Sequence, residues 1–485
     1  MGRAGTHYQG GSFSQAHPLR KPARFDLQVH NRKSRIKKTT MTIPTATTIP
    51  TAMTQALAKC RPLLCAAVGV LSTLGVLSLT HVGPAQAQSP GVNLAALVAQ
   101  VNTLKAQVAT LQQKTAPLSV SGTDLSLTGV NVHIVSGSGS TNDANNGGTL
   151  SGLGNLIIGY NALGNALGAG DVRTGSHNLI LGDRNNYSSF GGLVAGYNNA
   201  ISGQYASVSG GVRNTASSEY SSVSGGYNNT ASGDNASVSG GANNAASGTG
   251  ASVSGGNTNK ASRESSSVSG GQGSTASGQY ASVSGGANNA ASGKDASVSG
   301  GRGNTASRES SSVSGGQFNT ARGDYASVSG GTMNTASGDY ASVSGGYINT
   351  ASGQDASVSG GANNAASGHL ASVSGGGSNA ASGQAASVSG GVSNAASGGG
   401  ASVSGGEGNA ASGIGASVSG GTRNTASGTD TSVSGGGSNA ASGGGASVSG
   451  GTRNKASSEA SSVSGGSGRT QSTLYGWTGG TFKSP

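Results

Sequence analysis

The sequence predicts an all-β solenoid of 15-residue coils, preceded by one short helix. The pentapeptide Ser-Val-Ser-Gly-Gly recurs eighteen times at an unbroken 15-residue interval. A unit this short cannot bury a hydrophobic face by itself, so successive units must stack on one another. Composition agrees, because 90 glycines and only 4% aromatic residues leave too few bulky side chains for several conventional cores. The fixed register argues against a flexible Gly/Ser-rich linker.

Each regular unit, within residues 206–466, contains two short extended segments. Residues 206–211 alternate small or apolar residues with serine, as a strand with one buried face requires. This alternation turns the valine column inward and places Gly210 inward as well. The second segment, 214–216, ends in an alanine that every complete unit keeps. The expected core residues are therefore Val208, Val223, Val238, Ala216 and Ala231, with their equivalents along the array.

An asparagine column precedes this alanine column. Asparagine occupies the position in sixteen of seventeen units, and Ser274 is the exception. We expect a stacked ladder, formed by Asn214, Asn229, Asn244 and their equivalents, whose amides hydrogen-bond along the solenoid axis. The glycines at 210 and 211 predict positive φ angles or close backbone approach. Variation is concentrated at 212–213 and 218–220, which we expect to be solvent-facing corners.

Residues 53–87 have the pattern of a secretory signal peptide. The apolar run 63–79 leads to Ala85-Gln86-Ala87, a small-x-small cleavage pattern. We expect cleavage after this tripeptide and export to the bacterial cell surface or the extracellular space. The alternative is an uncleaved membrane anchor, for which 17 residues would be a marginal span. Cys60 and Cys65 lie in the signal peptide, so the mature chain must gain stability from stacking, oligomerisation or both.

The formal charge of +11 originates near the N-terminus. Residues 1–61 hold eleven of the 27 Lys and Arg residues against one acid, Asp26, and the remaining chain has a net charge of +1. The repeats therefore have no basic stripe for phosphates, and we expect no nucleic-acid partner. Residues 1–52 form a basic leader that indicates a misassigned start, with Met41 and Met53 as alternative starts.

Residues 88–116 carry a heptad pattern that predicts a coiled coil. The apolar residues are spaced three and four apart, with polar residues between them. They are Leu94, Leu97, Val101, Leu104, Val108 and Leu111. A helix this short is marginal alone, which favours association of chains. The alternative is a single amphipathic helix docked on the solenoid end. Pro117 ends the helix in either case.

Irregular segments flank the regular array. We expect residues 117–154 to form a β connector, because 118–135 alternates with the strand period. Residues 155–205 form three irregular, more apolar coils. Residues 467–485 form a C-terminal cap, since Arg469 and Gln471 break the ladder columns and stacking should stop there. The aromatic and apolar cluster expected to cover that end comprises Leu474, Tyr475, Trp477 and Phe482.

The phase of the irregular coils predicts an apolar outer face. Leu193 stands 15 residues before Val208, so we align it with the valine column. That alignment turns Val194 outward to the Ser209 position. The outward residues expected from it are Ile157, Ile180 and Val194. An exposed apolar face of this kind predicts contact between chains in the N-terminal third.

Chemistry-bearing residues are scattered along the chain. His133, His177 and His369 lie in different types of segment, and no serine has a periodic histidine or carboxylate beside it. The glycines precede no helical pattern that could form a phosphate loop. We therefore expect no enzyme activity, no catalytic or metal site, and no cofactor.

The unit Ser-Val-Ser-Gly-Gly-x-x-Asn-x-Ala-Ser-Gly resembles the YadA-like head repeats of trimeric autotransporter adhesins. The segments at 156–159 and 193–196 resemble them more closely still, and the resemblance covers residues 155–466. It implies a left-handed parallel β-roll, three chains packed side by side, and a head that binds host matrix or another surface. That family has a C-terminal membrane anchor, which we do not expect in residues 467–485. The resemblance thus favours an exported adhesin-like or surface-structural module that forms a homotrimer.

A second function stays open at this point. The outward Ser207 and Ser209 columns form two parallel rows of hydroxyls. Evenly spaced hydroxyls on a flat solenoid are also a feature of some ice-binding proteins. The alternative interpretation is therefore a monomeric passive or ice-binding β-solenoid.

Overall fold

The computed structural model describes residues 93–165 and 170–479. The predicted leader at 1–52 and signal peptide at 53–87 lie outside the described residues, as does Phe482. The chain divides into two units, Met1–Thr123 and Asp124–Pro485, which are described separately.

The first unit contains the helix that the heptad pattern predicts. Helix α3 spans Leu94–Thr115, and strand β1 follows at Leu118–Ser121. Asn93 caps the helix, because its side-chain oxygen accepts a hydrogen bond from the N–H of Ala96. No residue of α3 is buried, so its apolar positions are all exposed to solvent within this single chain.

The second unit begins with a segment that has little regular structure. It contains β2 at Asp124–Leu127 and the one-turn 3₁₀ helix η1 at Ala144–Asn146. Residues 128–135 form no strand, so the predicted extension of the β connector to residue 135 is wrong. Its alternating valines and isoleucine are exposed and have no neighbouring strand with which to pair.

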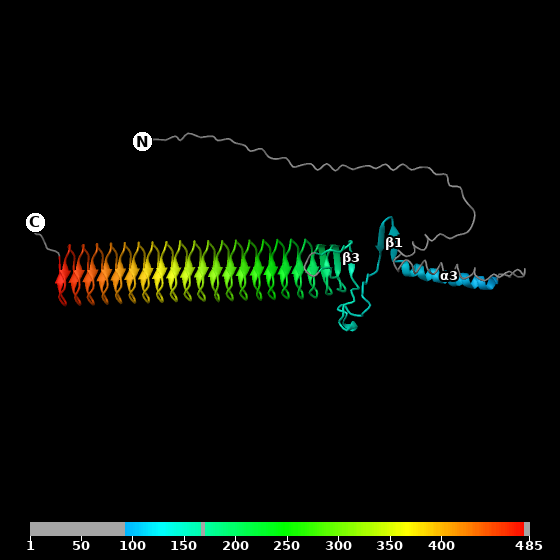
Figure 1. Ribbon diagram of the computed structural model, residues 1–485, viewed down its shortest axis with the longest axis horizontal. Coiled ribbons are helices and arrows are strands. Elements are labelled where there is room, and N and C mark those ends of the chain that lie inside the picture. Colours follow the sequence, from blue (N-terminus) through cyan, green and yellow to red (C-terminus); the bar gives the residue numbers. More distant parts are fainter. Residues whose placement is uncertain (1–92, 166–169, 480–485) are drawn as a thin grey trace, which may run out of the picture. The chain divides into compact units, whose positions relative to one another are not determined.

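A parallel β-solenoid follows, which confirms the predicted fold class and the 15-residue coil. Its coils stack along one axis, coloured from green to red in Figure 1. The irregular strands are β3 (Leu156–Ile158), β4 (Leu179–Asp183), β5 (Asn186–Tyr187), β6 (Leu193–Tyr197) and β7 (Ala200–Ile201). Each regular coil then contributes a Ser-Val strand, from β8 (Ser207–Val208) to β42 (Ser462–Val463). It also contributes a second strand ending in alanine, from β9 (Thr215–Ala216) to β41 (Lys455–Ala456).

Three columns of parallel main-chain pairing hold the coils together. The Ser-Val strands form one ladder, the alanine strands a second, and single bridges such as Val212 with Tyr227 a third. The valine and alanine columns face each other in the interior, where Val208, Val223, Ala216 and Ala231 are fully buried. Because every coil pairs with the next one, bulky side chains are unnecessary for a continuous core.

The first coils have a different register from the predicted one. Val194, rather than Leu193, is paired with Val208, and Ile180 is paired with Val194. These two coils therefore advance by 14 residues. The prediction that Ile157, Ile180 and Val194 occupy the outer face is wrong, because Ile157 is paired with Ile180 and all three belong to the valine column. Ile180 and Val194 are fully buried there. A shift of one residue exchanges the two faces of a strand, so their neighbours occupy the outer face instead.

Two further expectations are wrong. A Cβ atom on Gly210 would meet no heavy atom closer than 4.0 Å, so this position does not point into the core. Stacking also continues beyond Arg469, because β43 (Thr470–Gln471) and β44 (Trp477–Thr478) pair with the coil before them. Main-chain pairing tolerates the changed side chains. Leu474, Tyr475 and Trp477 stay largely exposed on this added coil rather than folding over its end.

Candidate functional site: faces, corners and N-terminal end of the solenoid

The asparagine column joins adjacent coils through the main chain. The Oδ1 atom of Asn214 accepts a hydrogen bond from the N–H of Asn229 at 2.9 Å. The Nδ2 atom of Asn229 donates to the carbonyl oxygens of Gly225 and Gly241, both at 2.9 Å. Each buried amide thus satisfies three main-chain groups at a corner where strand pairing is interrupted. Asn244 repeats the pattern one coil further on.

The two glycines of each pentapeptide have different roles. Gly226 has φ 92°, and a Cβ there would overlap the carbonyl oxygen of Gly241 and lie 2.5 Å from the Nδ2 atom of Asn229. Only glycine fits this conformation and this close approach. The preceding glycine, Gly225, has open space around it. The second glycine therefore keeps the corner compact enough for the asparagine ladder.

The outer face of the Ser-Val ladder is a uniform hydroxyl surface. Residues of the Ser207 column are partly exposed and those of the Ser209 column are exposed. In the described array, the hydroxyls of these two columns have no protein hydrogen-bond partner except at Ser464, which accepts from the indole N–H of Trp477. They are available to water or to a ligand over the whole regular array.

The same outer face is apolar at its N-terminal end. The corrected register places five leucine or isoleucine side chains in line with the two serine columns. They form what we name the N-terminal apolar face: Leu156, Ile158, Leu179, Leu181 and Leu193. Leu156 is 42% and Ile158 57% exposed, and the other three are partly exposed. A contiguous, exposed apolar patch that is rimmed by polar residues is typical of an interaction site.

The corners carry the exposed aromatic side chains. Tyr205 and Tyr220 stack with ring centroids 5.4 Å apart, and Tyr325 and Tyr340 stack at 5.0 Å. Parallel coils place equivalent side chains directly above one another, which explains these pairs. All four are between 44% and 56% exposed.

Four corners replace their usual glycine and add a serine three residues later. Arg308 is an example, because its N–H donates to the Oγ atom of Ser311 at 3.1 Å and its carbonyl accepts from the same hydroxyl at 2.8 Å. Equivalent pairs occur at Arg263 with Ser266 and at Ser218 with Ser221. The fourth pair is Ser458 with Ser461, where the hydroxyl donates at 2.7 Å. Sequence reasoning missed this pairing. In these four units the usual glycine is replaced by Arg or Ser and the alanine three residues later is replaced by Ser, and this joint replacement could have revealed it.

A buried carboxylate anchors the segment before the first coil. Asp143 is fully buried, and its oxygens accept from Ser136, Ser138 and Ser176 hydroxyls and from the Ser151 N–H, at 2.5–2.8 Å. The hydrogen bond from Ser138 contributes most to holding the pKa of Asp143 well below its usual range, followed by that from Ser151. Sequence reasoning missed this site because Asp143 and Ser176 are 33 residues apart and match no motif.

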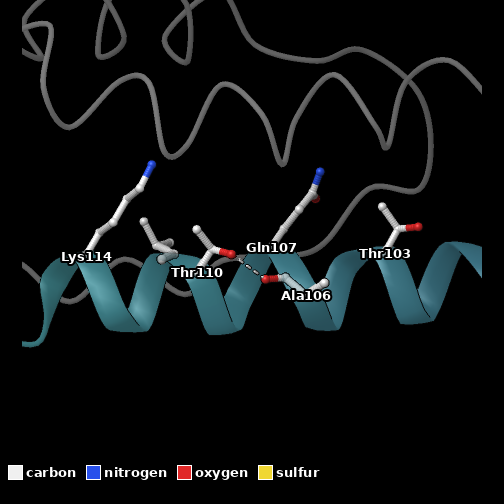
Figure 2. Close-up of a pocket in the computed structure, with 6 residues that line it drawn as sticks. Thr103, Ala106, Gln107, Thr110 and Lys114 are labelled. Atoms are coloured by element: carbon white, nitrogen blue, oxygen red, sulfur yellow. Dashed lines mark hydrogen bonds between the residues drawn. The ribbon is translucent and has the colours of Figure 1, made fainter.

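The predicted seam of helix α3 is exposed to solvent. Leu94, Leu97, Val101, Leu104, Val108 and Leu111 are 41–70% exposed. A side of the helix that includes Leu111 of the seam borders an open depression, for which α3 supplies all six described lining residues. Figure 2 shows Thr103, Gln107, Thr110 and Lys114 projecting there, and the Thr110 hydroxyl donating to the Ala106 carbonyl at 2.9 Å. A single helix with these side chains offers no set of converging groups for catalysis.

The described residues contain no group of three His, Cys, Asp or Glu side chains that could hold a metal ion. The three histidines of these residues, His133, His177 and His369, are far apart in sequence, and His369 faces Asp355 at 3.7 Å on a corner. Among the helices of the described ranges, none has the length and apolar character needed to cross a membrane.

Comparison with known proteins gives no relative by sequence. No family model matches the chain, and no curated protein matches it.

Proposed function

We propose that this protein is an exported, non-enzymatic surface module that presents a long β-solenoid and self-associates at its N-terminal end, as an adhesin-like structure would. The observation that carries the proposal is the distribution of surfaces along the stack. The Ser-Val face is polar over the regular array and carries a row of aliphatic side chains across β3, β4 and β6, whereas its other end carries the single residue Trp477. A self-association site and a long presenting body are thereby separated along one chain.

The oligomer in this proposal uses two apolar surfaces. One is the seam of α3, and the other is the N-terminal apolar face. Exposed apolar rows of this regularity favour parallel association of identical chains, and we favour a trimer in which the helices form a short coiled coil. Left-handed coils and lateral packing like that of YadA-like heads belong to the same proposal, and the repeat pattern supports them.

Sedimentation equilibrium of residues 88–485 tests self-association. We expect a multiple of the chain mass, and a shift towards monomer for the variant Leu156→Ser/Ile158→Ser/Leu181→Ser, which extends the serine columns to the first coils. The control Leu370→Ser/Val392→Ser removes two exposed apolar side chains from the regular array, each 52% exposed, and should leave the oligomer unchanged. A well-folded monomer of the unaltered chain would contradict the proposal.

Export and surface binding have their own tests. N-terminal sequencing of the secreted product should begin at Gln88, and a product that starts before residue 63 would contradict processing by signal peptidase. Cells that secrete the chain should attach to matrix-coated or abiotic surfaces. Removing six whole units, residues 206–295, preserves the register and should reduce attachment. Unchanged attachment after this deletion would show that adhesion does not depend on the length of the array.

The uniform hydroxyl surface favours one second candidate, a monomeric solenoid that binds ice or acts passively. Successive serines within each column are separated by the interstrand distance of about 4.8 Å. The Ser207 and Ser209 columns are separated from each other by about 6.6 Å along the strand. Such a face could match a hydrogen-bonding crystal lattice. Inhibition of ice recrystallisation, abolished by replacing Ser329, Ser344 and Ser359 with Lys, would support this candidate. Normal crystal growth in the presence of the unaltered protein would exclude it.

A further inference from the structure

His177 holds the segment before the first coil with both ring nitrogens. The N–H of Ser136 lies 3.0 Å from Nε2, and the carbonyl oxygen of Thr141 lies 2.9 Å from Nδ1. A main-chain N–H can only donate, so Nε2 is the unprotonated acceptor and Nδ1 carries the proton. The contact therefore fits the neutral imidazole alone. We name residues 136–143 the clasp.

The clasp has a second, chemically different attachment. At its other end Asp143 accepts hydrogen bonds from the Ser176 hydroxyl and the Ser151 N–H, at 2.8 and 2.7 Å. Ser176 and His177 are consecutive residues, so one dipeptide of the coil receives both attachments. Asp143 and His177 both have positive φ angles, 51° and 55°, a conformation that residues with a Cβ seldom adopt without compensating contacts.

We propose that the clasp is a pH-sensitive device: protonation of His177 breaks its hydrogen bond to the main-chain N–H of Ser136, while the attachments of Thr141 and Asp143 stay in place. Histidine side chains change charge between pH 5 and 8. An imidazolium donates from both nitrogens, so its Nε2–H would face the N–H of Ser136. Two N–H donors that face each other form no hydrogen bond, so the Ser136 N–H is left without an acceptor.

The surroundings of His177 offer little to stabilise the imidazolium. Among the described residues, no carboxylate oxygen lies within 4.0 Å of its ring nitrogens. The ionisable group on the clasp side is Asp143, whose oxygens are occupied by hydroxyl and N–H donors. The packing segment 151–155 contains no ionisable side chain, and a Cβ on Gly154 would lie 2.6 Å from the imidazole Cδ2. On the coil side, Arg173 is paired with Asp171 at 3.6 Å.

Asp143 behaves differently over the same pH range. Its lowered pKa keeps the carboxylate charged at pH 5, so its four hydrogen bonds persist when the histidine titrates. The clasp is therefore loosened only where the main chain enters it, at Ser136. This one-sided release distinguishes the proposal from general acid unfolding, in which both attachments would be lost together.

A spin label beside Ser136 tests the proposal. The full chain carries Cys60→Ser, Cys65→Ser and Val135→Cys, with a nitroxide at this single exposed cysteine. Lowering the pH from 7.5 to 5.0 should increase the mobile fraction of the label several-fold. The midpoint should coincide with protonation of His177, followed by ¹⁵N shifts of its ring.

Two further variants separate the histidine from other causes. Glutamine can accept from Ser136 and donate to Thr141 without titrating, so His177→Gln should keep the label immobile at both pH values. His369→Gln removes a distant histidine and should retain the full pH response. A label that is equally immobile at pH 7.5 and 5.0 in the unaltered background would overturn the proposal. So would an undiminished pH response in His177→Gln.

If His177→Gln is mobile at both pH values, the ring shifts of the unaltered protein decide. A neutral ring protonated at Nε2, or midpoints of ring and label that differ, would overturn the proposal. Protonation at Nδ1 with coincident midpoints would sustain it.

Discussion

Asn214 and Asn229, in adjacent coils, are joined by a hydrogen bond from the main-chain N–H of the second residue to the side-chain oxygen of the first. Similar bonds at 2.7–3.0 Å recur along the column, from Asn199 with Asn214 to Asn454 with Arg469. Since each amide also donates to two carbonyl oxygens, the column supplies pairing at the corner where strands cannot. Its one gap offers a direct measure of this contribution.

That gap is Ser274. Its hydroxyl lies 3.4 Å from the Asn289 N–H, against 2.9 Å for a regular pair, and it cannot reproduce the two amide donations. Ser274→Asn should restore all three hydrogen bonds and raise the free energy of unfolding by about 1–2 kcal/mol. Urea denaturation measures the change. Ser269→Asn, on the exposed face, is the matched control and should be neutral. Loss of stability in Ser274→Asn would show that the serine coil has relaxed to a geometry of its own.

Adjacent glycines should differ sharply in their tolerance of alanine. Gly241 has φ 82°, and its new methyl group would overlap the Gly256 carbonyl oxygen. Gly241→Ala should cost about 2 kcal/mol or more, from the left-handed backbone and the overlap together. Gly240→Ala should change stability by about 0.5 kcal/mol or less, because its methyl group would meet open space. Thermal denaturation of the two variants provides the comparison, and equal losses would refute the distinction.

A charge in the valine column should interrupt stacking. Val328 is 1% exposed and is paired with Val313 and Val343, so Val328→Asp would bury an unpaired carboxylate. We expect a loss of several kcal/mol. Asp324→Ala, at the neighbouring corner, should change stability by about 0.5 kcal/mol or less. Circular dichroism melting curves report both, and similar curves would mean that Val328 does not face inward.

The Asp143 carboxylate should stabilise the protein except in strong acid. Its pKa is lowered in the folded state, so its contribution is complete above the unfolded value of about 3.9 and is lost as the pH falls towards the folded value. The difference in Tm between the unaltered protein and Asp143→Asn should therefore be constant from pH 5 to 8 and shrink below about pH 4. Asp124→Asn, an exposed site, should leave Tm unchanged. A Tm difference that instead grows below about pH 4 would contradict the predicted direction of this pH dependence.

Several structural features follow directly from the residue pattern. Strict recurrence of Val208 and its equivalents predicts the coil length, and alternation with serine predicts the inward column. Recurrent asparagine at a corner predicts a buried ladder, because a polar residue is retained there in nearly every unit. These inferences depend only on local geometry and on the need of short units to stack.

Other features required contacts between distant segments. A 15-residue spacing suggested pairing Leu193 with Val208, but main-chain pairing puts Val194 there in a 14-residue coil. Spacing alone could not detect a coil shortened by one residue, and that residue decides which leucines form the N-terminal apolar face. The Gly210 position was misjudged for a similar reason, because the chain turns into its corner before the alternation ends.

The sequence by itself determined an all-β stack with a 15-residue period, since repetition leaves no other way to bury its small apolar columns. Only the tertiary structure decided the register of the first coils, the continuation of stacking past Arg469, and the attachment of the clasp to Ser176 and His177. The physical reason is that these outcomes depend on hydrogen bonds between chain segments that no periodicity connects. The repeated sequence specifies the structure of each regular coil, whereas the structure at the ends of the stack depends on particular contacts.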